Sequence, residues 1–124
     1  MIMRTGIWVA LQFLNTVSKR QLIKYTGKAE LLLGRIFTKR EQYQQAEEKI
    51  RAALTKLTEV GNPKQLWLTH TALAKLYTKM NRLDLEREQW QAANTVVQST
   101  VDVLEDETLK KVFINAAPVQ EILE

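Results

Sequence analysis

The sequence predicts an all-α protein built from stacked antiparallel helical hairpins. Apolar residues recur at helical spacing almost throughout its 124 residues, and no stretch alternates cleanly enough to predict a strand. Four Gly and two Pro leave little material for loops. A shift of 40 residues superimposes two apolar patterns on two later ones, which is typical of repeated helical units. We expect one domain over residues 1–124.

The first part of the chain is expected to hold an N-terminal helix, residues 1–26, followed by the first repeat, residues 27–61. The helical part of the first segment is placed at residues 7–24. Two apolar stripes, separated by the polar residues 38–42, define the two helices of the repeat and are expected to face the core. The first stripe consists of Tyr25, Ala29, Leu32, Leu33, Ile36 and Phe37, and the second of Tyr43, Ala46, Ile50, Ala53, Leu54 and Leu57.

The break before the second repeat, residues 62–104, carries three local signals. Gly61 can take the left-handed conformation that ends a helix, and Asn62-Pro63 is an N-cap followed by Pro at the first helical position. The stripes of this repeat are Leu66, His70, Leu73, Ala74, Tyr77 and Met80, and then Leu83, Trp90, Ala93, Val97, Val101 and Leu104.

Residues 105–124 are expected to form a C-terminal capping helix. Asp106 and Glu107 lie near the positive end of its dipole, and Pro118 breaks it and opens a last turn. The inward residues are placed at Leu109, Val112, Phe113 and Ala116.

The two repeats match residue by residue at the 40-residue offset. Leu33-Gly34-x₂-Phe37 corresponds to Leu73-Ala74-x₂-Tyr77, and Ala46-x₃-Ile50 corresponds to Glu86-x₃-Trp90. This pattern resembles the tetratricopeptide repeat, W-x₂-L-G-x₂-Y followed by A-x₃-F. Glu30 and His70 stand where that family has Trp, and the 40-residue spacing exceeds its usual period of about 34, so the repeats are degenerate.

Residues 62–124 carry a second set of motifs: Leu73-Ala74-x₂-Tyr77, Trp90-x₂-Ala93 and Asp106-Glu107-x-Leu109-x₃-Phe113-x₄-Pro118-Val119. With these motifs the segment resembles the closing part of helical-repeat arrays at the C-terminal ends of large bacterial regulators that carry an ATPase or a nucleotide cyclase. The resemblance implies a detached sensory or scaffold portion, because no phosphate loop, cyclase site or helix-turn-helix is present in this chain.

The tetratricopeptide resemblance implies a non-catalytic scaffold that binds a protein or peptide on a concave surface lined by the first helix of each hairpin. Positions four apart share a helical face, so the matching cations form two rows, Arg35 with Lys39 and Lys75 with Lys79. Such a groove favours an acidic peptide or a C-terminal carboxylate. The alternative is an ordinary solvated helix face. The matching face comprises Leu31, Arg35, Thr38, Lys39, Thr71, Lys75, Thr78 and Lys79.

The charge distribution keeps a second class of partner open. Residues 1–40 carry a balance of +7, whereas the remaining 84 residues sum to −3. Clustered Lys and Arg favour nucleic-acid phosphates, but no recognised binding motif accompanies them and the acidic C-terminal region opposes the same ligand. Nucleic acid is therefore the alternative to a protein partner.

Enzymatic function is not expected. The chain has no Cys and a single histidine, His70, which excludes thiolate chemistry and paired-histidine metal sites. It carries no Gly-rich phosphate loop or nucleophile elbow, so we expect no catalytic residue and no cofactor. The absence of Cys favours a reducing, cytoplasmic compartment, and the apolar run at residues 7–14 is too short to span a membrane.

The N-terminal segment is predicted to mediate association. Ile7, Trp8, Leu11 and Leu14 form an apolar face at helical spacing, and little else in the chain is assigned to cover it. Two repeats are fewer than the three usually needed for a stable stack. Either the end helices act as caps, or residues 1–26 form a homodimer interface, which is the outcome we predict.

Overall fold

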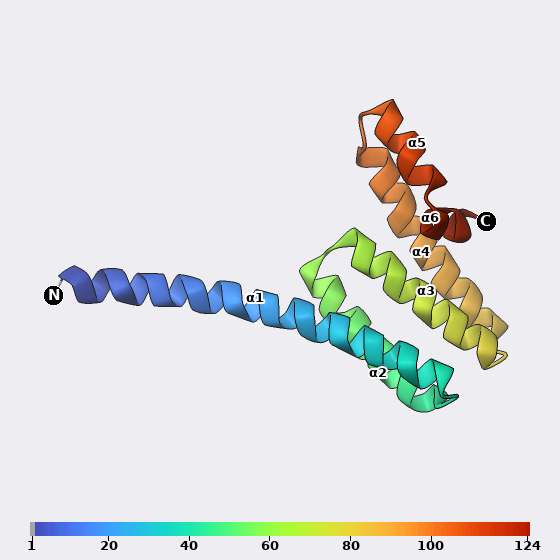
Figure 1. Ribbon diagram of the computed structural model, residues 1–124, viewed down its shortest axis with the longest axis horizontal. Helices are drawn as coiled ribbons and strands as arrows, with labels where there is room; N and C mark the ends of the chain where they lie inside the picture. Colours follow the sequence, from blue (N-terminus) through green and yellow to red (C-terminus); the bar gives the residue numbers. More distant parts are fainter. Residues whose placement is uncertain (1) are drawn as a thin grey trace.

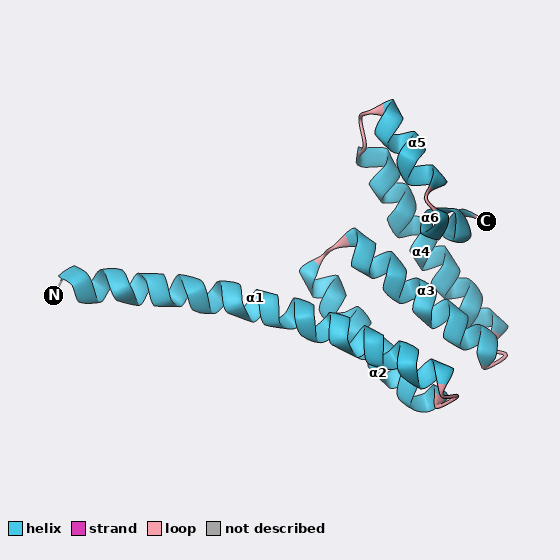
Figure 2. Ribbon diagram, in the orientation of Figure 1, coloured by secondary structure: helices cyan, strands magenta, loops and turns pink. Residues whose placement is uncertain are grey.

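The computed structural model describes residues 2–124, with the side chains of residue 12 and of residues 18–124. All regular secondary structure in that range is helical, which confirms the all-α prediction (Figure 2). In chain order the helices are α1 (Ile2–Lys39), α2 (Tyr43–Val60), α3 (Pro63–Lys79), α4 (Leu83–Val103), α5 (Glu107–Asn115) and α6 (Ala117–Leu123).

The helices form two stacked hairpins, as expected. The C-terminal part of α1 pairs with α2, α3 pairs with α4, and α2 packs against α3 (Figure 1). Within each hairpin the helices run antiparallel because the connecting turns are only a few residues long. The short helices α5 and α6 lie against the second hairpin at its C-terminal end (Figure 1).

The two hairpin turns share one backbone geometry at the 40-residue offset. Glu41 and Asn81 adopt left-handed φ angles of 62° and 58°. The amide of the next residue then donates a 2.9 Å hydrogen bond back into the helix. In the first turn Gln42 donates to the carbonyl of Phe37, and in the second Arg82 donates to the carbonyl of Tyr77. This is the Schellman closure of a helix C-terminus. The repeat predicted from side chains therefore extends to the backbone.

The break between the hairpins follows the local signals. Gly61 has a φ of 79°, and its amide donates to the carbonyl of Leu57 at 2.9 Å. The side chain of Asn62 accepts a 3.3 Å hydrogen bond from the amide of Gln65, and Pro63 is the first residue of α3. The predicted C-cap, N-cap and N1 residues are confirmed.

The first two expected helices are one continuous helix, α1, of 38 residues. The expectation of a separate helix over residues 7–24 was wrong, because nothing in the sequence between the two segments stops a helix. Gly27 alone costs a helix about 1 kcal/mol, which packing offsets. A Cβ atom on Gly27 would lie 3.0 Å from Cγ of Leu57, so the glycine permits α1 and α2 to approach closely.

The face that α1 buries also differs from the expected one. The buried positions are Gly27, Leu31, Gly34 and Thr38, which lie on the side of α1 opposite to most of the predicted stripe. Leu31, which was expected on the concave surface, is instead a core residue with 4% of its surface exposed. The physical reason is that small residues on this side let α2 come close, and close contact buries more atoms than a bulky face would.

Two apolar cores hold the fold together. The first lies between α1, α2 and α3, and the second joins α3, α4 and α6. The rings of Trp67 and Phe113 meet edge to face at 5.4 Å, which attaches α5 to the second core. The first core contains Leu31, Ala46, Ile50, Ala53, Leu57, Ala72, Leu73, Leu76 and Tyr77, and the second contains Trp67, Ala93, Val97, Val119 and Ile122.

Candidate functional site

A basic groove lies between α1 and α3. The groove has a volume of about 300 Å³. Both helices contribute side chains from their C-terminal halves, so the groove follows the first helix of each hairpin. The lining residues are Arg35, Thr38, Lys39, Thr71, Ala72, Lys75 and Lys79.

The cations of the groove come together because the two helices repeat the same positions. Arg35 and Lys39 are one helical turn apart on α1, and Lys75 and Lys79 are one turn apart on α3, at an offset of 40 residues. The packing of the two hairpins brings these equivalent faces to one cavity. Four positively charged side chains therefore surround about 300 Å³ of space.

Two threonines at equivalent positions differ in whether they line the groove. The hydroxyl of Thr38 donates a 2.8 Å hydrogen bond to the carbonyl of Gly34, and that of Thr78 donates one of 2.9 Å to the carbonyl of Ala74. Thr38 lines the groove, whereas the predicted site residue Thr78 is exposed and does not line it. The structure adds Ala72, which the sequence patterns did not place in the groove.

One cation of the groove is already paired. The Nζ atom of Lys75 lies 2.8 Å from Oε1 of Glu121, which α6 brings back toward α3. Arg35, Lys39 and Lys79 form no ion pair with any described residue. Sequence reasoning missed Glu121 because its position depends on the fold of α5 and α6, and no repeat spacing connects it with Lys75.

One residue that lines the groove carries an unsatisfied polar atom. The hydroxyl oxygen of Thr71 is buried and has no hydrogen-bond partner among the described residues. Buried polar atoms without a partner are uncommon, since each costs about 1–3 kcal/mol. Thr71 lines the groove together with Ala72 and Lys75, but its hydroxyl oxygen is closed off from solvent.

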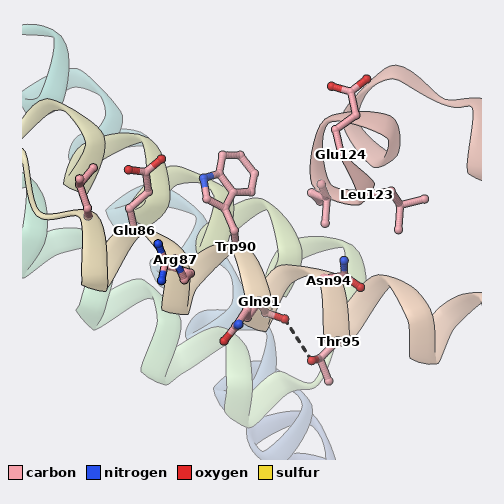
Figure 3. Close-up of a pocket in the computed structure, with 10 residues that line it drawn as sticks. Glu86, Arg87, Trp90, Gln91, Asn94, Thr95, Leu123 and Glu124 are labelled. Atoms are coloured by element: carbon pink, nitrogen blue, oxygen red, sulfur yellow. Dashed lines mark hydrogen bonds between the residues drawn. The ribbon is translucent and has the colours of Figure 1, made fainter.

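A larger groove of about 710 Å³ lies between α4 and the C-terminal end of the chain. Figure 3 shows Trp90 standing out from α4, with Leu123 and Glu124 across the groove from it. Its charges have both signs, from Glu86 and Arg87 on α4 and from Glu124. This groove therefore offers a ligand no single charge preference, in contrast to the basic groove. The sequence patterns place Trp90 on an apolar stripe and so assign it to core or interface packing.

The predicted interface residues Ile7, Trp8, Leu11 and Leu14 belong to α1, but their side chains lie outside the described residues. A homodimer through residues 1–26 therefore stays a prediction.

The side chain of the single histidine packs against the neighbouring helix. His70 is partly buried, and its Nδ1 atom lies 2.8 Å from Oε1 of Gln89, at hydrogen-bond distance.

The described residues contain no cluster of three or more side chains suited to a metal ion. None of the helices in the described part of the chain combines the length and apolar character needed to cross a membrane.

Comparison with family models, with curated proteins and with solved structures finds no match to this chain.

Proposed function

We propose that this protein is a non-catalytic scaffold of tetratricopeptide-like hairpins that holds an acidic peptide segment, or the C-terminal carboxylate of a protein partner, in the basic groove. The observation that carries the proposal is the convergence of Arg35, Lys39, Lys75 and Lys79 on one cavity. Three of these cations have no ion pair among the described residues, so they are available to pair with a carboxylate of a ligand. Because the chain has no Cys, we place the protein in the cytoplasm.

The groove would bind a carboxylate by charge-assisted hydrogen bonds. A guanidinium group such as that of Arg35 can hold both oxygens of a carboxylate at once, whereas an ammonium group acts as a point charge. Lys39 and Lys79 add positive potential on both sides of the cavity.

The proposal can be tested with a short peptide of alternating glutamate and serine that has a free C-terminal carboxylate. Binding would be measured by fluorescence anisotropy at low and physiological salt. The double variant Lys75→Glu/Lys79→Glu reverses two charges of the groove, so we expect its affinity to fall by about tenfold or more. The matched control is Lys110→Glu/Lys111→Glu, which makes the same change in net charge on α5. Equal weakening by both double variants, or no binding at all, would contradict the proposal.

A second candidate is a nucleic-acid-associated regulatory protein, which the balance of +7 in residues 1–40 favours. Binding to phosphates releases counterions, so log affinity should fall linearly and steeply as log salt concentration rises. Titration of a labelled single-stranded oligonucleotide at several salt concentrations distinguishes the two candidates. A flat salt response excludes nucleic acid.

A further inference from the structure

An exposed apolar stripe runs along α1 on the side away from α2. Apart from the adjacent pair Leu32 and Leu33, its members recur every three or four residues, so they share one face of the helix over about four turns. Five of them are bulky and well exposed: Leu22 at 66%, Tyr25 at 60%, Leu32 at 58%, Leu33 at 41% and Ile36 at 38%. Ala29, also exposed, lies at the centre of this face, and we call the six residues together the outer α1 stripe.

Three of the equivalent positions on α3 are buried. At the 40-residue offset, Leu32, Leu33 and Ile36 correspond to Ala72, Leu73 and Leu76, whose exposed fractions are 8%, 0% and 0%. These α3 residues belong to the core that contains the buried side chains of α2, and α2 packs against α3. In the second copy of the repeat, a helix therefore packs along the face that is exposed on α1.

The charges beside the stripe indicate which kind of partner helix would pack on it. Lys28, Arg35 and Lys39 follow one edge of the stripe, and Nζ of Lys28 lies 5.9 Å from the centre of the Tyr25 ring. The acidic residue nearest to the stripe on α1, Glu30, is already held by Lys56 at 2.6 Å. A helix with carboxylates beside its apolar seam therefore complements this face.

A second copy of this chain fits the face less well. Two α1 helices packed on each other would bring rows of like charge together, which is unfavourable. The acidic C-terminal region includes α5, on which Leu109 and Val112 are 56% and 65% exposed, so the expectation that these two residues face inward was wrong. However, α5 has nine residues and is about 13 Å long, whereas the outer α1 stripe extends over about 21 Å.

We propose that the outer α1 stripe is a second protein-binding surface, which takes an amphipathic helix with acidic flanks from a partner protein and packs it as α3 packs α2. The surface is distinct from the basic groove, although Arg35 and Lys39 lie between the two. It does not depend on the proposed peptide binding, and variants of α1 outside the groove separate the two sites.

The probe is a designed helical peptide of about four turns, with leucine and alanine along one face and glutamate on both flanks. Its matched counterpart carries lysine at every glutamate position. We expect the glutamate peptide to bind at least about tenfold more tightly than the lysine peptide, by titration calorimetry. Leu32→Glu/Leu33→Glu should abolish this binding, because it puts carboxylates on the apolar seam. The control Leu109→Glu changes a leucine of similar exposure on α5 and should leave binding unchanged.

A charge reversal outside the groove gives the second test. Lys28→Glu should lower the affinity for the glutamate peptide and raise the affinity for the lysine peptide. The affinity of the basic groove for the acidic peptide should stay within about twofold. Circular dichroism spectra of each variant confirm that the helices are retained. Equal affinity for the two peptides, or binding that survives Leu32→Glu/Leu33→Glu, overturns the proposal. So does light scattering that shows a homodimer which this double variant dissociates, because a second copy would then occupy the stripe.

Discussion

The backbone of Gly34 lies directly against the side chain of Ile50. A Cβ atom on Gly34 would be 2.3 Å from Cγ1 of Ile50 and 3.3 Å from the carbonyl oxygen of Ala46. Two helices of the first hairpin therefore meet at a glycine, and a methyl group at this position must displace either a buried side chain or the backbone of α2.

We expect Gly34→Ala to lower the free energy of unfolding by about 1–3 kcal/mol, because overpacking exceeds the gain of about 1 kcal/mol in helix propensity. Urea unfolding followed by circular dichroism measures the change. Ile50→Ala removes Cγ1 and Cδ1, the two atoms nearest to the added methyl group, so the double variant should lose less stability than the sum of the two single variants. Gly34→Ala with increased stability would show that Ile50 rotates away at no cost.

Glu41 holds a left-handed conformation that suits Asn better. Its φ is 62°, and the equivalent residue of the second turn, Asn81, has a φ of 58°. We expect Glu41→Asn to raise the free energy of unfolding by about 0.5–1 kcal/mol, since Asn tolerates this region more readily. The reciprocal variant Asn81→Glu should lower it by a similar amount. Both changes are measurable by thermal or urea unfolding, and a loss of stability in Glu41→Asn would contradict the expectation.

The stability of the fold should depend on the ionisation of Tyr77. Burial of its ring, together with the negative charge of Glu47, raises the pKa of Tyr77 above its usual value of 10.0, against the opposing effect of Arg51. Tyr77 donates a 3.3 Å hydrogen bond to Oε1 of Glu47 and accepts one from Arg51. A raised pKa favours the neutral phenol in the folded state. The contribution is therefore complete below about pH 10 and is lost as the pH rises through the folded-state pKa.

Tyr77→Phe removes this titration, so the unfolding free energy of the variant should fall less steeply than that of the parent protein above about pH 10. Urea unfolding at a series of pH values from neutral to strongly alkaline provides the comparison. Tyr25→Phe, at a tyrosine that is 60% exposed, is the control and should follow the parent curve. Identical slopes for Tyr77→Phe and the parent would refute the assignment.

Glu121 should compete with any acidic ligand for Lys75. The two side chains are about half exposed, so their ion pair contributes under about 1 kcal/mol to stability and can be broken readily. We expect Glu121→Gln to raise the affinity for the acidic peptide about two- to fivefold, because residue 121 then has no carboxylate to pair with Lys75. Glu124→Gln makes the same charge change at the larger groove. Equal gains in both variants would mean that net charge, and not the Lys75 pair, sets the affinity.

Local signals made most of the helix bounds predictable. Gly61, Asn62 and Pro63 end α2 and begin α3 by their own backbone preferences, so this boundary can be predicted from the local sequence. The 40-residue offset likewise brought Arg35 and Lys75 to equivalent places, because equal positions on equivalent helices face the same way.

The buried face of α1 could not be predicted in the same way. Leu31, Leu32 and Leu33 give the helix apolar residues on several sides, so apolar spacing alone does not choose between them. The choice depends on how closely α2 approaches Gly27 and Gly34, which is a property of both helices together. The contact between Lys75 and Glu121 depends in turn on the path of the chain through α5 and α6.

The length of α1 has a mechanical consequence. A helix of 38 residues is about 57 Å long, whereas α2, with 18 residues, is about 27 Å long. Arg20 is hydrogen-bonded at 3.4 Å to the carbonyl of Val60, the last residue of α2, and the turns of α1 before it extend alone in Figure 1. Those turns form a lever arm of about 27 Å. A sideways force at the N-terminal end therefore acts on the first hairpin with a torque proportional to that length.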